Sequence, residues 1–192
     1  MRVVRRGTPD KGEVLLLTGP AGSGKSTAAR LLADGGAEPS VLLLGDFFAH
    51  SLRSGRLRGW EPGAEPQNEV VVEATADAAG AYASGGYFVV VDGMIRPAYL
   101  PIFVESIARR AVHLHAVVLR PPLEVVLSRS HGRPARERHD DAVLGRIYSY
   151  FDDLAAYEHH ILDNAAHDPE ETASAIRVRV AGGRSKLTWV TS

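Results

Sequence analysis

The 192-residue sequence contains no cysteine, which excludes disulfide bonds and every metal site built on thiolates. It also lacks a run of the roughly 18 apolar residues that a membrane-spanning helix needs. The charged start, from Met1 to Gly7, has no apolar core of the kind found in signal peptides. Together these absences favour a cytoplasmic protein without a membrane partner.

An excess of charge of one sign is missing as well. The chain has 22 basic and 23 acidic residues and a net charge of −1. A dedicated nucleic-acid-binding protein usually concentrates its basic residues on one face, so a nucleic-acid partner is not expected and small-molecule chemistry is favoured. The length predicts a single domain, residues 1–192, and the composition leaves the oligomeric state open.

The most informative stretch that is present runs from residue 19 to residue 26 and fits G-x-x-x-x-G-K-[ST] in full. An apolar run (14–17) precedes it and a helix-like segment (27–33) follows, which is the context of a phosphate-binding loop. A glycine-rich turn that matches by accident is the alternative, and this context argues against it. Glycines let backbone N–H groups surround a phosphate at the start of the helix. The predicted nucleotide-binding residues are Gly19, Pro20, Ala21, Gly22, Ser23, Gly24, Lys25, Ser26 and Thr27.

Two members of this loop have side chains suited to ATP and Mg²⁺, which normally arrive together at such a site. Lys25 adds a mobile positive charge that can contact the phosphates and stabilise their transfer. Ser26 offers a hydroxyl that can ligate Mg²⁺. The loop therefore predicts ATP and Mg²⁺ as cofactors.

Elsewhere in the chain, strand-like and helix-like segments alternate. This pattern predicts a three-layer α/β/α domain, with a five-stranded parallel sheet and helices on both faces. The basic segment 130–139 has no apolar periodicity and predicts an exposed, mobile lid, and the tail 182–192 is expected to be loosely ordered. The further strands are expected at 41–44, 87–91, 112–119 and 160–162, and the further helices at 47–57, 66–82, 97–110, 123–130, 140–154 and 169–180.

Two aspartates follow strands, at the edge where parallel sheets bind their ligands. Asp92 ends a strand expected beside the first one and is a candidate Mg²⁺ ligand; the alternative is an aspartate that hydrogen-bonds the turn at Gly93. Asp46 follows the second strand and is a candidate for taking the proton of an acceptor hydroxyl. Its alternative role is to cap the helix expected from Phe47 onward.

Several arginines are candidates for binding anionic groups. Arg133, with Arg136 and Arg138 on the same segment, is a candidate for closing over the phosphoryl group in transfer, and a solvated basic loop is the alternative. Arg53 and Arg96 are candidates for an anionic group on the acceptor, against the alternative of ordinary surface arginines. The adjacent histidines 159 and 160 point in different directions and lack a completing carboxylate, so a metal site is not expected there.

From about Glu13 to Val180 the sequence resembles the small P-loop kinases of the nucleoside monophosphate kinase fold, among them chloramphenicol phosphotransferase, gluconate kinase, shikimate kinase and adenylate kinase. The phosphate loop carries most of this resemblance, with Asp46, Asp92 and the stretch 129–133, which is similar to the R-x-x-G-R entry to the adenylate kinase lid. The resemblance implies that Arg129 stacks on adenine, that Arg133 reaches the phosphates, and that Asp46 acts on the acceptor.

The function expected from these features is an ATP-dependent kinase that phosphorylates a hydroxyl group of a small molecule, such as an antibiotic or a sugar acid. One alternative is a nucleotide-dependent switch or chaperone without a small acceptor. Another is a toxin-like or nucleic-acid-end kinase. The sequence does not identify the acceptor, because a pocket's shape does not follow from side-chain types alone.

Overall fold

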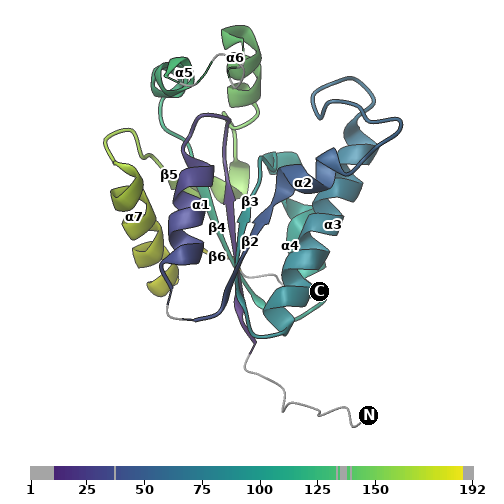
Figure 1. Ribbon diagram of the computed structural model, residues 1–192, viewed down its shortest axis with the longest axis vertical. Coiled ribbons are helices and arrows are strands. Elements are labelled where there is room, and N and C mark those ends of the chain that lie inside the picture. The colour runs from purple at the N-terminus through teal and green to yellow at the C-terminus, as the bar shows by residue number, and fades with distance from the viewer. Residues whose placement is uncertain (1–10, 37, 133, 135–137, 139, 188–192) are drawn as a thin grey trace.

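A computed structural model of the chain describes residues 11–187, apart from 37, 133, 135–137 and 139. Its centre is a six-stranded sheet (Figure 1) with the order β2-β3-β1-β4-β5 and a sixth strand, β6, beside β4. Every pairing along β2-β3-β1-β4-β5 is parallel, as the sequence predicts, and only β6 runs antiparallel to its neighbour. The strands are β1 (Glu13–Thr18), β2 (Ser40–Leu44), β3 (Phe88–Asp92), β4 (His113–Leu119), β5 (Ile161–Leu162) and β6 (Lys186–Leu187).

Helices cover both faces of this sheet and form the outer two layers. The α1 and α7 helices lie together on one side, and α3 and α4 lie together on the other (Figure 1). This arrangement confirms the predicted three-layer α/β/α class. The helices are α1 (Lys25–Asp34), α2 (Gly45–His50), α3 (Glu65–Ser84), α4 (Leu100–Ala108), α5 (Leu123–His131), α6 (Asp141–Ser149) and α7 (Pro169–Ala181), with short 3-10 turns η1 (Pro97–Tyr99) and η3 (Ala155–His160).

The alternation of side chains along β1 explains why both faces are apolar. Val14 and Leu16 pack into the core beneath α3 and α4, whereas Leu15 and Leu17 pack into the core beneath α1 and α7. All four side chains are fully buried. A strand covered on both faces needs an unbroken apolar run rather than an alternating one, which is what residues 14–17 provide.

The segment after β2 differs from the expectation of a helix over 47–57. The α2 helix starts at Gly45 and ends at His50, and the following residues form a loop as far as Ala64. Gly55 adopts a left-handed conformation, with φ of 67°, that a continuing helix does not allow. The amide of Gln67 on α3 holds this loop, because it accepts from the Leu57 N–H and donates to the Leu57 carbonyl at 2.9 Å in each case.

The expectation of a loosely ordered tail was wrong for residues 182–187. After α7 the chain turns and adds β6 antiparallel to β4, with Leu187 opposite Leu114. Ser185 is buried, and its hydroxyl lies 2.9 Å from Nδ1 of His115. Two residues are too short for a strand signal in the sequence, and residues 188–192 lie outside the described part of the chain.

The start of α6 agrees with the sequence-based expectation. Asp140 caps α6 as expected, since its carboxylate accepts from the Ala142 N–H at 2.8 Å. The α7 helix begins with a capping box that sequence analysis missed. In it the Asp168 carboxylate accepts from the Glu171 N–H and the Glu171 carboxylate accepts from the Asp168 N–H. This box fixes the loop between β5 and α7.

Candidate active site

The phosphate loop connects β1 to α1, and three of its glycines have positive φ angles: 136° at Gly19, 85° at Gly22 and 95° at Gly24. A Cβ atom on Gly19 would lie 2.1 Å from the carbonyl oxygen of Leu119 on the neighbouring strand, so a side chain cannot be accommodated there. Gly24 immediately precedes the first residue of α1 and provides no capping side chain. No side-chain cap therefore competes with an anion for the N–H groups at this helix start.

Lys25 is the first residue of α1, and its side chain is folded into the loop. Its ammonium donates to the carbonyl of Pro20 at 2.8 Å and approaches the hydroxyl of Ser23 at 3.5 Å. The residue is only 8% exposed. The positive charge therefore lies at the concave side of the turn, where the phosphates of a nucleotide bind in a loop of this sequence.

Two residues far along the chain, Arg129 and Asn164, support the phosphate loop through hydrogen bonds to its backbone. Arg129, at the end of α5, donates to the carbonyls of Ser23 at 3.3 Å and of Asn164 at 2.9 Å. Asn164, just after β5, is buried and its side-chain amide donates to the same Ser23 carbonyl at 3.0 Å. Arg129 therefore lies beside the phosphate loop, as the predicted contact with the nucleotide requires, while its stacking on adenine stays a prediction.

The sheet register brings the predicted carboxylates to the phosphate loop. Leu44 of β2 and Leu17 of β1 are both paired with Asp92 of β3, so the three strands end level with one another. Asp46 follows β2 by two residues, and Gly19 follows β1 directly. A cavity of about 420 Å³ lies over these strand ends, and Asp46 and Asp92 both line it together with most of the phosphate loop.

The structure places Asp46 in the first turn of α2 and not at its cap. Leu44 precedes the helix, which begins at Gly45, and no side chain caps it. The helix-capping role is therefore wrong for Asp46, whose carboxylate belongs to the lining of the cavity. The expectation failed because α2 starts two residues earlier than its apolar pattern indicates.

The donor set around Asp92 suits a hard cation. The Ser26 hydroxyl and the Asp92 carboxylate line the same cavity, and oxygen ligands with remaining positions left for phosphate oxygens and water are what Mg²⁺ requires. Among the described residues no group of three or more His, Asp or Glu side chains is arranged to hold a metal on its own. An ion here would thus be shared between protein and nucleotide.

Arg96 also lines the cavity and is held by contacts with aromatic rings and hydrogen-bond acceptors. Its guanidinium lies between the rings of Tyr99 and Tyr150, at 4.7 Å from each centroid. It also donates to the Gly59 carbonyl at 3.2 Å and to the Tyr99 hydroxyl at 2.5 Å. Arg96 therefore joins α6, η1 and the loop before α3 at one point, and it is not an ordinary surface arginine.

The remaining predicted residues divide into two groups. Arg53 lies in the loop after α2 but is not among the residues that line the cavity, whereas Arg56 is. Arg133, the predicted lid residue, lies outside the described residues, together with most of the segment 130–139. Roles for Arg53 and Arg133 therefore stay predictions.

Sequence reasoning missed several residues that the fold brings into the cavity. His50 is four residues after Asp46, and its Nδ1 lies 2.6 Å from the Asp46 carbonyl. Asn68, on α3, donates to the Gly59 carbonyl at 2.9 Å. The i, i+4 spacing of Asp46 and His50 was a readable signal, because such residues share one face of a helix. Asn68, Tyr99 and Tyr150 come from three separate elements and had no signal.

Residues 14–154 match the sequence profile of a family described as the AAA domain. The chain belongs to this family. The match runs from β1 past α6, so it contains the phosphate loop, Asp46, Asp92 and Arg96. No curated protein matches the sequence.

Among solved structures, the fold is similar to that of several small kinases. APS kinase from Mycobacterium tuberculosis, in complex with AMPPNP and APS, superposes with a TM-score of 0.70 at 18% identity, over 90% of this chain and 99% of that one. A gluconokinase from Sinorhizobium meliloti gives 0.66 at 20% identity, over 93% and 97%. The tunicamycin resistance protein of Deinococcus radiodurans gives 0.63 at 20%, over 95% and 100%. These likenesses establish the fold of a small P-loop kinase.

Proposed function

We propose that the protein is an ATP-dependent phosphotransferase that phosphorylates a hydroxyl group of a small molecule, with Mg²⁺ as cofactor. The observation that carries this proposal is the continuity of one cavity of about 420 Å³, which joins the phosphate loop to a pocket containing Asp46 and Arg96. A site for phosphate and a site for an acceptor therefore share one space. The similarity to small kinases supports the same reaction class.

On the nucleotide side, the loop N–H groups and Lys25 bind the phosphates of ATP. Ser26 and Asp92 would hold Mg²⁺, which neutralises phosphate charge when bound. Arg129 and Asn164 keep the loop in shape through the Ser23 carbonyl, so the donors are preorganised before ATP arrives.

On the acceptor side, Asp46 takes the proton of the substrate hydroxyl as the oxygen attacks the γ-phosphorus, and ADP leaves. The level strand ends and the lining of one cavity by Asp46 and the phosphate loop support this role. The two hydrogen bonds that the Arg96 side chain donates to described residues both use Nη2. Its other N–H groups are available among the described residues to bind an anionic group of the acceptor, as found in a sugar acid.

The alternatives explain less of this geometry. A nucleotide-dependent switch or chaperone needs neither a carboxylate like Asp46 nor a tightly packed arginine like Arg96 in the cavity beside the phosphate loop. A nucleic-acid-end kinase needs an extended basic groove, whereas the cavity away from the phosphate loop has only Arg56 and Arg96 as arginines among its described lining residues. A small acceptor therefore fits best.

The experiment has two stages. Purified protein is first screened for ATP consumption against sugars, sugar acids, nucleosides and hydroxylated antibiotics. With an acceptor in hand, Asp46→Asn is compared with Asp34→Asn, which removes an exposed carboxylate at the end of α1. The Asp46 variant should lose about 100-fold or more in kcat with ATP affinity kept, and the Asp34 variant should behave as wild type. An unchanged kcat in Asp46→Asn would rule out its role as the base.

A further inference from the structure

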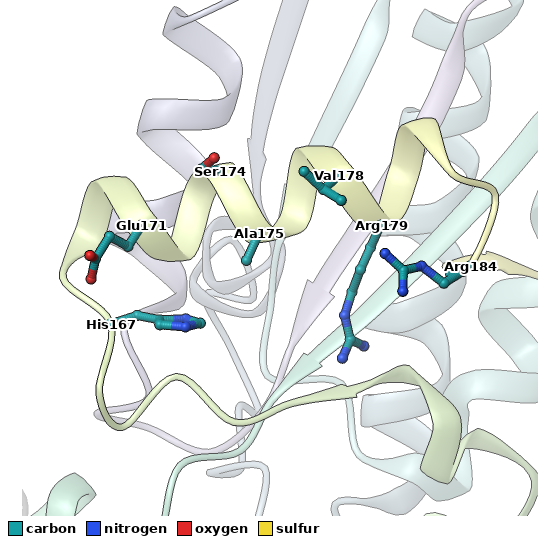
Figure 2. A pocket seen from close by; sticks show the side chains of 7 residues that line it. All are labelled: His167, Glu171, Ser174, Ala175, Val178, Arg179 and Arg184. Carbon is teal, nitrogen blue, oxygen red and sulfur yellow. The ribbon is translucent and has the colours of Figure 1, made fainter.

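A second hollow lies along α7 (Figure 2) and shares no lining residue with the cavity over the strand ends. It measures about 450 Å³ and runs along the helix from the loop before α7 to the turn that leads into β6. None of the residues that line it belongs to the candidate active site. They are His167, Glu171, Ser174, Ala175, Val178, Arg179 and Arg184. We call this hollow the α7 groove.

Two arginines give the α7 groove an unbalanced positive charge. Within the part of the chain that the structure describes, the guanidinium groups of Arg179 and Arg184 have no hydrogen bond and no ion pair. Arg179 is half-buried, and burial followed by the nearby charge of Arg184 lowers the pKa of Arg179. Arginine side chains that are partly withdrawn from water usually have an anionic partner. This pair lacks one.

Neighbouring groups do not supply the missing negative charge. The Glu171 carboxylate lies at the far end of the groove and accepts from the Asp168 N–H in the capping box. Arg177, on the same helix, is engaged differently, because it donates to the Leu31 carbonyl of α1 at 2.7 Å. The two arginines of α7 therefore differ in their contacts. Arg177 connects α7 to α1, whereas Arg179 points into the groove (Figure 2).

His167 lies at the other end of the groove. Its Nδ1 is buried and has no hydrogen-bond partner among the described residues, and the imidazole lies across Ala175 from Arg179 (Figure 2). The small side chain of Ala175 leaves room between them. Deeper in the protein, His160 is fully buried, and its Nε2 has no partner among the described residues; burial lowers the pKa of His160, and the nearby charges of His159 and Arg179 lower it further. The groove therefore has two arginines at one end and His167 at the other.

We propose that the α7 groove binds a phosphate-bearing small molecule, with its phosphate on Arg179 and Arg184 and the rest of the ligand extending toward His167. Two adjacent guanidinium groups offer paired N–H donors that match the oxygens of a phosphate dianion better than a single carboxylate. The volume of the groove exceeds that of a phosphate alone, which leaves space for a sugar-sized body.

The test is a residue-resolved titration, because phosphate also binds the phosphate loop. Inorganic phosphate and ribose 5-phosphate are added separately to isotopically labelled protein, with acetate as a carboxylate control, and amide and arginine Nε resonances are followed by NMR. Ribose 5-phosphate should produce saturable shifts at Ser174, Ala175, Arg179 and Arg184. These shifts should be separate from any at residues 19–26, and acetate should produce none in the groove.

Variants connect the shifts to the two guanidinium groups. The double variant Arg179→Gln/Arg184→Gln should weaken ribose 5-phosphate binding in the groove at least about tenfold. Arg30→Gln, at an exposed arginine on α1, matches the change of charge of Arg184→Gln alone and should bind as wild type. If the double variant does not fold, Arg184→Gln alone removes an exposed group and should give a smaller loss. Shifts confined to the phosphate loop, or equal binding by the Arg184 and Arg30 variants, would overturn the proposal.

Discussion

Asn164 is the buried support of the phosphate loop, so its removal should damage both stability and nucleotide binding. Its side-chain Nδ2 donates to the Ser23 carbonyl at 3.0 Å and approaches the Thr172 hydroxyl at 3.4 Å, whereas its Oδ1 has no partner. The residue is 2% exposed. Asn164→Ala removes the donor and leaves a small void, and it keeps the main-chain carbonyl that Arg129 binds.

The expected magnitude follows from these contacts. A buried neutral hydrogen bond contributes about 1 kcal/mol net, and the lost side-chain volume adds up to about 1 kcal/mol. The Ser23 carbonyl is not left unpaired, because Arg129 still donates to it at 3.3 Å. A total of about 1–2 kcal/mol corresponds to a decrease in Tm of roughly 2–8 °C for a chain of this size. Affinity for an ATP analogue should fall in parallel, because Ser23 lies within the loop.

Asn164→Asp separates hydrogen bonding from packing. It keeps the volume but puts a carboxylate in place of the donor that faces the Ser23 carbonyl, so we expect a larger loss than for alanine in both Tm and analogue affinity. Thermal unfolding and calorimetric titration on the two variants provide both values. If aspartate is tolerated as well as asparagine, the support of the loop through this amide is refuted.

Two other predictions concern the glycines and the buried histidines. Gly19→Ala combines a positive φ with a contact of 2.1 Å to the Leu119 carbonyl, so it should lower the free energy of unfolding in urea by at least about 2 kcal/mol. Gly63→Ala also has a positive φ but meets nothing within 4 Å, so it should lower that free energy by about 1 kcal/mol. Equal losses in the two variants would refute the clash at Gly19. Burial lowers the pKa of His160 and His115 below 6.5 in the folded state, so the unfolded chain binds protons first as the pH falls. The free energy of unfolding should therefore fall as the pH drops through 6.5 toward the folded pKa. His160→Gln should weaken this pH dependence, and an unchanged slope would contradict the prediction.

The fold was predictable because its signals are local. The apolar runs at residues 14–17 and 41–44 can be buried on both faces only in a parallel sheet with helices on either side, and the structure confirms that sheet. The sequence also predicts that Asp92 lies on a neighbour of β1, and it does. What the sequence could not predict depends on contacts between distant segments: β6 exists because Ser185 and Leu187 meet β4, some 70 residues earlier in the chain.

The candidate site shows the same division. The phosphate loop is contiguous, so its residues could all be named from the sequence. Asn164 and Tyr150 could not, because each meets its partner across more than 50 residues: Asn164 meets Ser23, and Tyr150 meets Arg96. A side chain that acts by supporting another group has no sequence motif of its own. Only the three-dimensional contacts in the folded chain identify it.

The phosphate loop tests the central claim most directly. ATP turnover and formation of a phosphorylated product should be measured with the acceptor found by screening, for the wild type, for Lys25→Ala and for Lys11→Ala. Lys11 is an exposed lysine whose ammonium donates to the Arg110 carbonyl, and it makes a matched control. We predict that Lys25→Ala folds normally and loses nearly all turnover while Lys11→Ala retains it, because Lys25 lies in the phosphate loop and is the lysine proposed to contact groups whose charge changes during transfer. A folded Lys25→Ala protein that turns over ATP at the wild-type rate would contradict the account.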